Sequence, residues 1–137
     1  MGADSDVVRR LTDEVFVGGD FSHWDDLMSD DFVDHDPMPN VSNDKKGQRQ
    51  IAEMVVAGFS DRKAESDEYV DTADGRVVEN WVFGGRHTGE MMGIPPSGKD
   101  VHVRGIEIWR CANGKIVEHW GVVDMSDVLE KAGLVPG

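Results

Sequence analysis

Side chains that could move protons are concentrated in and around strand-like runs of this chain. Glu107 and Asp124 each lie in such a run beside a tryptophan, and His35 follows an earlier apolar run. Burial among apolar groups disfavours the charged form of a carboxylate, which makes it a stronger base. A carboxylate with such a raised pKa can act as a general acid or base, and a histidine can share in the proton transfer. These three residues are therefore candidates for general acid/base catalysis.

Each candidate also has a structural explanation. Asp124 lies two residues before Ser126 and could cap a C-terminal helix. His35 could be a loop histidine bonded to a neighbouring aspartate. Glu107 lies between apolar neighbours, where an unpaired charge is costly, so it either pairs with an arginine or faces a pocket. The residues alone leave these alternatives open.

Aromatic and flexible apolar residues accompany the candidates and could line a pocket for a small molecule. Tryptophans fill cores as readily as they bind ligands, and either role is consistent with their positions. A methionine pair precedes the Gly/Pro-rich segment GIPPSG and could serve as an adaptable lid or as core filling. The predicted substrate-binding residues are Trp81, His87, Trp109, Trp120 and Met91.

Alternation along the predicted strands decides which of these side chains share a face. In the run 100–111, Glu107 and Trp109 fall on one face. In the run 115–124, Trp120 and Asp124 fall together, whereas His119 falls on the other face, as an interface or sheet-surface histidine. With Trp81 and His87 on their own strand, these faces could enclose one interior, unless a β-bulge reverses an assignment.

The order of the predicted helices and strands along the chain indicates the fold class. Apolar spacing predicts helices over 5–18, near 22–28 and over 48–59, and a last helix between Ser126 and Gly133. Strands are predicted over 32–36, 66–72, 76–87, 100–111 and 115–124, with Asp74-Gly75 and Asn113-Gly114 as tight turns. Helices followed by a meander of strands predict one α+β domain over residues 1–137, with a curved antiparallel sheet wrapped on N-terminal helices.

Composition limits the partners. The formal net charge is −13, which would repel nucleic acid and anionic lipid, so we expect neither as a partner. No apolar run is long enough to span a membrane, and the N-terminus lacks the apolar core of a signal peptide. Cys111 is the only cysteine, which fits the reducing cytoplasm, where we expect the protein. The histidines show no short HxH or HxxxH spacing, and we expect no metal.

Four motifs carry a family resemblance. The runs HTGEMMGIPPSGKDV, GIEIWR and NGKIVEHWGVVD, together with FVDHDP near residue 35, resemble the SnoaL-like polyketide cyclases of the NTF2-like superfamily. The resemblance covers most of the chain. It implies an NTF2-like cone, a homodimer formed through the sheet, and chemistry without metal or cofactor.

The resemblance also implies roles for individual residues. Asp124 matches the acid/base aspartate of the family and His35 a polar pocket residue. Glu107 and Trp109 match two polar pocket positions, and Trp109 departs from the pattern because it is bulky and apolar. The expected function is a cyclase or isomerase acting on a small, apolar, polyketide-like carbonyl compound. The alternatives are a non-catalytic small-molecule binder and an interaction module.

Overall fold

A computed structural model describes residues 2–135 as an α+β fold, so the ends of the predicted domain, residues 1 and 136–137, lie outside the described part. The elements follow one another in the order helices, strand, helix, four strands and a final helix. They are α1 (Ala3–Arg10), η1 (Leu11–Val17), α2 (Trp24–Leu27), β1 (Met28–Asp34), α3 (Lys45–Gly58), β2 (Phe59–Asp71), β3 (Arg76–His87), β4 (Asp100–Ala112), β5 (Lys115–Asp124) and α4 (Ser126–Lys131).

The five strands form one sheet in the order β1-β5-β4-β3-β2. The meander from β2 to β5 is antiparallel, as predicted, whereas β1 runs parallel to β5. The predicted antiparallel meander is confirmed, and the structure adds β1 as a parallel strand at its edge. A parallel neighbour needs a long crossover, and here α3 and the three following strands supply it.

The predicted turns and helices occur with shifted boundaries. Asn113 and Gly114 have φ angles of 54° and 78°, the positive values that a tight hairpin between β4 and β5 requires. The first helix starts at Ala3 and widens to a π-helix over η1, so the predicted helix 5–18 is two joined segments. At α3, Asp44 accepts a hydrogen bond from the Gly47 amide at 2.9 Å and caps the helix.

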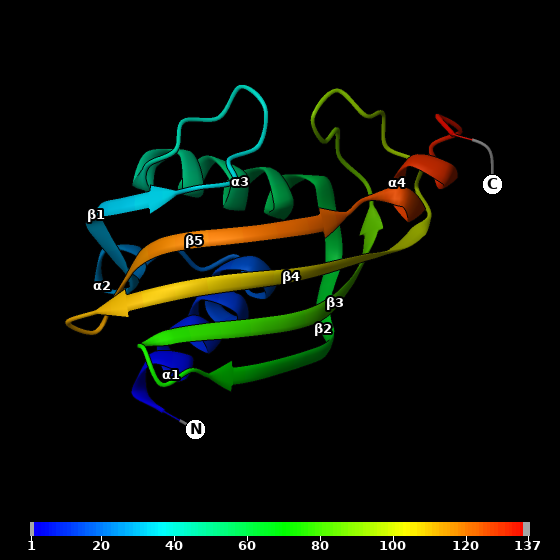
Figure 1. The fold of residues 1–137 in the computed structure, drawn as a ribbon. Coiled ribbons are helices and arrows are strands. Elements are labelled where there is room, and N and C mark those ends of the chain that lie inside the picture. The colour runs from blue at the N-terminus through cyan, green and yellow to red at the C-terminus, as the bar shows by residue number, and fades with distance from the viewer. Residues whose placement is uncertain (1, 136–137) are drawn as a thin grey trace.

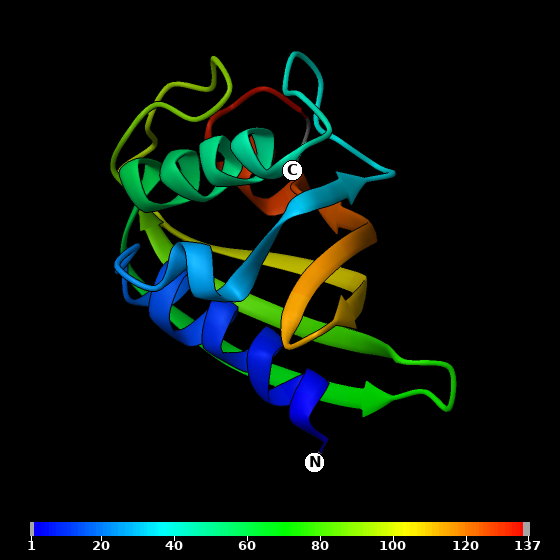
Figure 2. The ribbon, with the colours of Figure 1, turned by 90° about the vertical axis from the view of Figure 1, so that its left-hand side faces the viewer.

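Helices α1 and α3 lie on one side of the curved, unclosed sheet, which bends around them (Figures 1 and 2). Two apolar clusters form where they meet the sheet. The first joins α1, η1, α2 and β1 to the sheet through buried residues that include Leu11, Trp24 and Phe32. The second, with Phe59 and Val103, lies where β2, β3 and β4 meet α4. Among residues 2–135, no helix combines the length and apolar character needed to cross a bilayer.

Candidate active site

A cavity of about 330 Å³ opens between the helices and the concave face of the sheet. Its walls are mostly apolar and come from both core clusters. Polar groups interrupt this lining around Glu107, around Glu79 and at the buried residue Gln48. The apolar wall includes Phe16, Ile51, Val55, Phe59, Phe83, Met91, Val103 and Met125.

The first polar centre is a chain of hydrogen bonds that runs across four neighbouring strands. His119 on β5 contacts Asp34 on β1 through Nδ1, at 2.8 Å from Oδ1. Its Nε2 lies 2.7 Å from Oε1 of Glu107 on β4. The other oxygen of Glu107 accepts a hydrogen bond from the indole of Trp81 on β3, at 2.7 Å. Asp34, Glu107 and His119 are all buried and all line the cavity.

The charge of this centre follows from its geometry. Burial alone would lower the pKa of His119, but hydrogen bonds to Asp34 and Glu107, and their charges, outweigh burial and raise it to about 9. Burial would likewise raise the pKa of Asp34, but the contact with His119 lowers it. At neutral pH the imidazole is therefore a cation whose two N–H groups both donate to carboxylates.

Two glycines, Gly105 and Gly121, leave room for this hydrogen-bond network because they have no side chain. Gly121 lies directly opposite Glu107 on the neighbouring strand. A Cβ on Gly121 would lie 2.2 Å from Oε1 of Glu107 and 2.9 Å from Nε2 of His119. Gly105, opposite Trp81, is equally constrained, because a Cβ there would lie 2.3 Å from the indole. Larger residues at either position would displace the carboxylate or the ring that holds it.

The second polar centre is built around Glu79 on β3. Its Oε1 accepts a hydrogen bond from the Trp109 indole at 3.0 Å, and its Oε2 accepts one from the Thr12 hydroxyl at 2.8 Å. The ring of Trp109 also packs against His119, with centroids 4.3 Å apart. Trp109 thus forms the wall between the two centres and contacts both.

Asp124 lies outside the cavity, which corrects its expected position. Its side chain is exposed, and Oδ1 accepts a hydrogen bond from the Ser126 amide at 2.9 Å. Hydrogen bonding from the Ser126 side chain, and then from its amide, lowers the pKa of Asp124, the reverse of what a buried base requires. In this structure Asp124 holds the start of α4, as the capping interpretation proposed.

Asp124 was expected in the cavity because regular alternation was assumed along β5, but this strand contains a β-bulge. Cys111 on β4 pairs with Ile116, but the preceding residue, Arg110, pairs with Glu118, so β5 advances two residues where β4 advances one. Such a bulge exchanges the two faces of the strand beyond it. His119, predicted on the outer face, therefore faces the cavity, and Asp124 faces away from it.

His35 and Trp120 also lie away from the cavity, contrary to expectation. Their rings stack with centroids 4.6 Å apart, and Nε2 of His35 lies 2.7 Å from Glu118. His35 is exposed because it follows β1 at the point where the buried alternation Phe32, Asp34 ends. Trp120 is turned outward by the bulge.

His87 is fully buried but does not line the cavity, so its expected contact with a substrate is also corrected. Its ring packs beside Phe59, with centroids 5.5 Å apart, and Nδ1 accepts a hydrogen bond from the Ser97 amide at 3.4 Å. The structure brings the remaining predicted residues to the cavity wall. These are Glu107, Trp81, Trp109 and Met91.

The sequence did not identify six polar residues that line the cavity, which are Thr12, Asp34, Asp36, Gln48, Glu79 and His119. His119 was hidden by the bulge, and Asp34 comes close to it only because β1 pairs in parallel with β5. Thr12 lies in η1, and no sequence motif marked this part of the helix as a candidate site. Glu79 had a usable signal, because it lies two residues before Trp81 and therefore shares its face.

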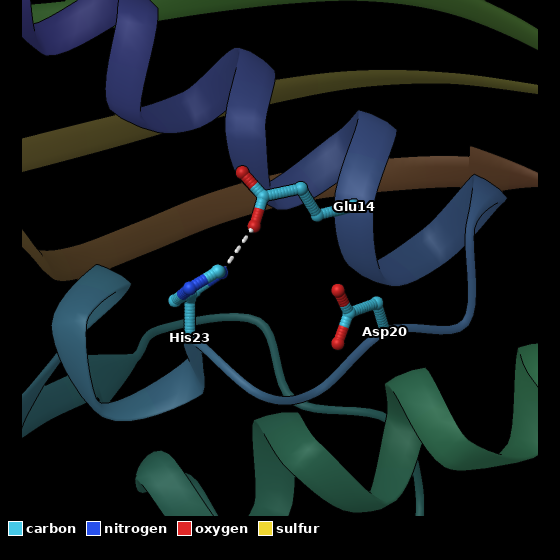
Figure 3. A group of neighbouring side chains, drawn as sticks. All are labelled: Glu14, Asp20 and His23. Atoms are coloured by element: carbon cyan, nitrogen blue, oxygen red, sulfur yellow. Dashed lines mark hydrogen bonds and ion pairs between the residues drawn. The ribbon is translucent and has the colours of Figure 1, made fainter.

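A further cluster lies on the surface between η1 and α2 (Figure 3). Glu14, Asp20 and His23 bring three potential metal-ligand atoms within 4.8 Å of one another. Glu14, however, already accepts hydrogen bonds from Arg10 at 2.6 and 3.3 Å, and the neighbouring cation lowers its pKa. Asp20 accepts from the Ser22 amide at 2.9 Å. The cluster is accounted for as a surface network of ion pairs.

The fold and cavity define an NTF2-like α+β cone, and comparison with known proteins specifies the family. The chain belongs to the SnoaL-like polyketide cyclases, because residues 6–131 match the sequence profile of that family. No curated protein sequence is significantly similar to the chain.

Solved structures agree with this assignment. IdmH from Streptomyces antibioticus, a proposed polyketide cyclase, is 29% identical with a TM-score of 0.78, over 95% of this chain and 98% of IdmH. AclR from Streptomyces galilaeus, a proposed hydroxylase, is 25% identical with a TM-score of 0.79, over 98% of this chain and 83% of AclR. TsrD from Streptomyces laurentii, at 21% identity, shares the fold with a TM-score of 0.79, over 97% of this chain and 96% of TsrD.

Proposed function

We propose that the protein is a cyclase or isomerase-type enzyme that moves protons on a small, apolar, polyketide-like carbonyl substrate. One observation carries the proposal: a buried carboxylate, Glu107, lines an apolar cavity and is fixed on both oxygens by N–H donors. A base so held is oriented before the substrate arrives, which is the main requirement for efficient proton transfer.

The residues of the first polar centre have different roles in the proposed proton transfer. Glu107 takes the proton from the carbon next to the substrate carbonyl. His119 cannot be the base, because as a cation it has no free lone pair, so it balances the charge of Glu107 and fixes its position. Asp34 is a positioning residue that holds the imidazolium from the opposite side. This replaces the roles first given to Asp124 and His35.

The cavity sets the class of substrate. Its volume of about 330 Å³ is at the small end of ligand pockets, and its lining is dominated by phenylalanine, valine and methionine side chains. A compact ring-bearing ketone fits these properties better than a charged metabolite. The reaction as derived uses only side chains of this chain, and it requires no cofactor.

Assembly and location are part of the same proposal. Ile106 and Val122 are direct partners on β4 and β5, point away from the cavity, and are 43% and 73% exposed. Apolar exposure at the centre of a sheet favours a homodimer through this face. The single cysteine, Cys111, is buried and free, which is compatible with a cytoplasmic protein.

The test uses an aromatic bicyclic ketone, 2-tetralone, whose exchange of carbon-bound hydrogen with deuterated water is followed by NMR. Glu107→Gln keeps the shape of the side chain but removes the base, and we expect exchange to fall by about 10²- to 10⁴-fold. Asp124→Asn is the matched control, because it changes an exposed carboxylate to its amide, and it should exchange as the wild type does. If the wild type binds the ketone but does not accelerate exchange, the cavity belongs to a binding protein and the enzymatic proposal fails.

A further inference from the structure

The second polar centre places an acid where the proposed reaction needs a donor. Glu79 is 3% exposed, and together with Thr12 it lines the cavity. Removal of a proton next to a carbonyl leaves negative charge on the carbonyl oxygen, and that charge needs a proton or a hydrogen bond. In the first centre both N–H groups of His119 and the indole N–H of Trp81 already donate to carboxylates, so the oxygen must find its donor elsewhere.

Glu79 is paired with a second carboxyl group, Asp67. The two side chains interact directly, and the Tyr69 hydroxyl contacts both, donating a short hydrogen bond to Asp67 and lying 3.2 Å from Oε2 of Glu79. Oδ1 of Asp67 is buried and has no hydrogen-bond partner among the described residues. Glu79 is buried and Asp67 is partly buried, so their charges would repel each other at close range, and a proton held between the two carboxyls supplies the donor that Oδ1 of Asp67 lacks.

Burial is the largest cause that raises the pKa of Glu79, and the hydrogen bond and charge of Asp67 add to it, giving a value of about 8. The hydroxyl of Thr12 and the indole of Trp109 act in the opposite direction without outweighing these causes. Glu79 therefore carries a proton at neutral pH, in agreement with the geometry of the pair.

Glu79 also has the right position relative to the proposed base. Glu79 and Glu107 are direct partners on adjacent antiparallel strands, so their side chains emerge on the same face at neighbouring points. The Thr12 hydroxyl, 2.8 Å from Oε2 of Glu79, reaches the cavity from the helical side. Without substrate this hydroxyl donates its hydrogen bond to Glu79. When the hydroxyl turns to donate to a bound carbonyl oxygen, its own oxygen can accept the proton of Glu79, so it can connect Glu79 to the substrate.

We infer that Glu79, acting through the hydroxyl of Thr12, is the general acid that protonates the substrate's carbonyl oxygen while Glu107 takes the proton from the adjacent carbon. The inference rests on the proposed function and adds the second half of its chemistry. It also limits the substrate to ketones whose oxygen can point toward Thr12 on η1 while the acidic carbon points toward Glu107 on β4.

The protons and electron pairs balance in this step. The C–H bond breaks as Glu107 gains its proton, and that electron pair forms the C=C bond of the enol. The carbonyl π pair forms an O–H bond with the proton of Thr12, which receives the proton of Glu79 in return. In a ring closure the enol carbon then attacks a second carbonyl, whose oxygen takes the proton from Glu107. As the first C=O bond forms again, the enol proton returns through Thr12 to Glu79.

The first test measures the proton itself and needs no substrate. Infrared difference spectra at pH 7 between wild type and Glu79→Gln should show the loss of one neutral carboxyl C=O band that shifts in deuterated water. Asp67→Asn should move the pH at which this band disappears to a lower value, because it removes the hydrogen bond and the charge of Asp67 while the burial of Glu79 remains. Glutamine keeps acceptor and donor atoms for Thr12 and Trp109, so the variant is expected to fold. If no neutral carboxyl band depends on Glu79, the inference fails.

The second test follows hydrogen exchange into 2-tetralone across pH. Thr12→Val should slow exchange by about 10²-fold, and Thr12→Ser should restore it, because only the serine retains the relay hydroxyl. In the wild type, exchange should fall as pH rises through about 8, and Asp67→Asn should move this fall to lower pH. A merely structural role for Asp67 would leave the position of the fall unchanged.

The outcomes separate the two proposals. Wild-type exchange that Thr12→Val leaves intact overturns the role of Glu79 and leaves Glu107 as the base. Wild-type protein that does not accelerate exchange overturns the proposed function, and the catalytic role of Glu79 fails with it, whatever the infrared spectrum shows.

Discussion

Glu79 and Glu107 face each other across β3 and β4, and each accepts a hydrogen bond from a tryptophan on the other's strand. Trp81 of β3 donates to Glu107 of β4, and Trp109 of β4 donates to Glu79 of β3. Beyond these crossed pairs their surroundings differ, because Glu107 contacts the His119 cation and Glu79 contacts another acid. Two carboxyls in one cavity are thereby given opposite electrostatic surroundings, which is how acid and base roles are separated in a single site.

Stability should decline as pH rises from about 5 to about 9. In the folded protein the pKa values of Glu79 and His119 are raised from 4.5 and 6.5 to about 8 and about 9. A raised pKa adds stability that is complete below the ordinary pKa and is lost as pH rises through the folded one. Each group can lower the free energy of unfolding by roughly 1.4 kcal/mol per pH unit while it titrates.

Urea denaturation at several pH values measures this decline. Glu79→Gln should remove the part of the decline that Glu79 contributes between about pH 4.5 and 8, and it should leave the part that His119 contributes between about pH 6.5 and 9. Stability that is constant or rises between pH 5 and 8 would contradict the assigned proton states.

Gly121→Ala should damage both stability and exchange. The added methyl would lie 2.2 Å from Glu107 Oε1, and neither that carboxylate nor His119 can move without breaking a buried hydrogen bond. We expect a loss of about 1–3 kcal/mol in the free energy of unfolding, with slower exchange into 2-tetralone. A variant as stable and active as wild type would show that the carboxylate is not held where the structure places it.

Asp124→Ala should affect stability alone. The variant loses the hydrogen bond from the Ser126 amide at the start of α4, which should cost about 1 kcal/mol. Thermal unfolding measures that cost, and the rate of 2-tetralone exchange should match the wild type. Loss of exchange with an unchanged melting temperature would return Asp124 to the mechanism.

Val122→Asp should dissociate the proposed homodimer. The change places a charge on the outer face of the sheet beside Ile106, and burying it against a second copy would be costly. Light scattering after gel filtration should give the mass of a dimer for the wild type and of a monomer for the variant. A wild type that is monomeric at all concentrations would rule the dimer out.

Much of the fold could be predicted from local patterns. Asn113-Gly114 specified its hairpin because few other dipeptides adopt two positive φ angles without strain. Apolar spacing predicted the helices, although their ends moved by a few residues because capping and packing compete there. The β1–β5 parallel pair was not predictable in this way, since no local signal joins residues some 85 positions apart.

For the site, the sequence by itself determined that Glu107 and Trp109 share a face with each other and that Glu79 shares one with Trp81, because regular strands alternate strictly. Only the tertiary structure decided which histidine and which aspartate join them. One additional residue in β5 exchanged the two faces of that strand beyond Ile116. The parallel pairing of β1 with β5 brought Asp34 next to His119. Bulges and long-range strand pairs arise from the packing of the whole sheet, so the local sequence of the residues that form them does not indicate where they occur.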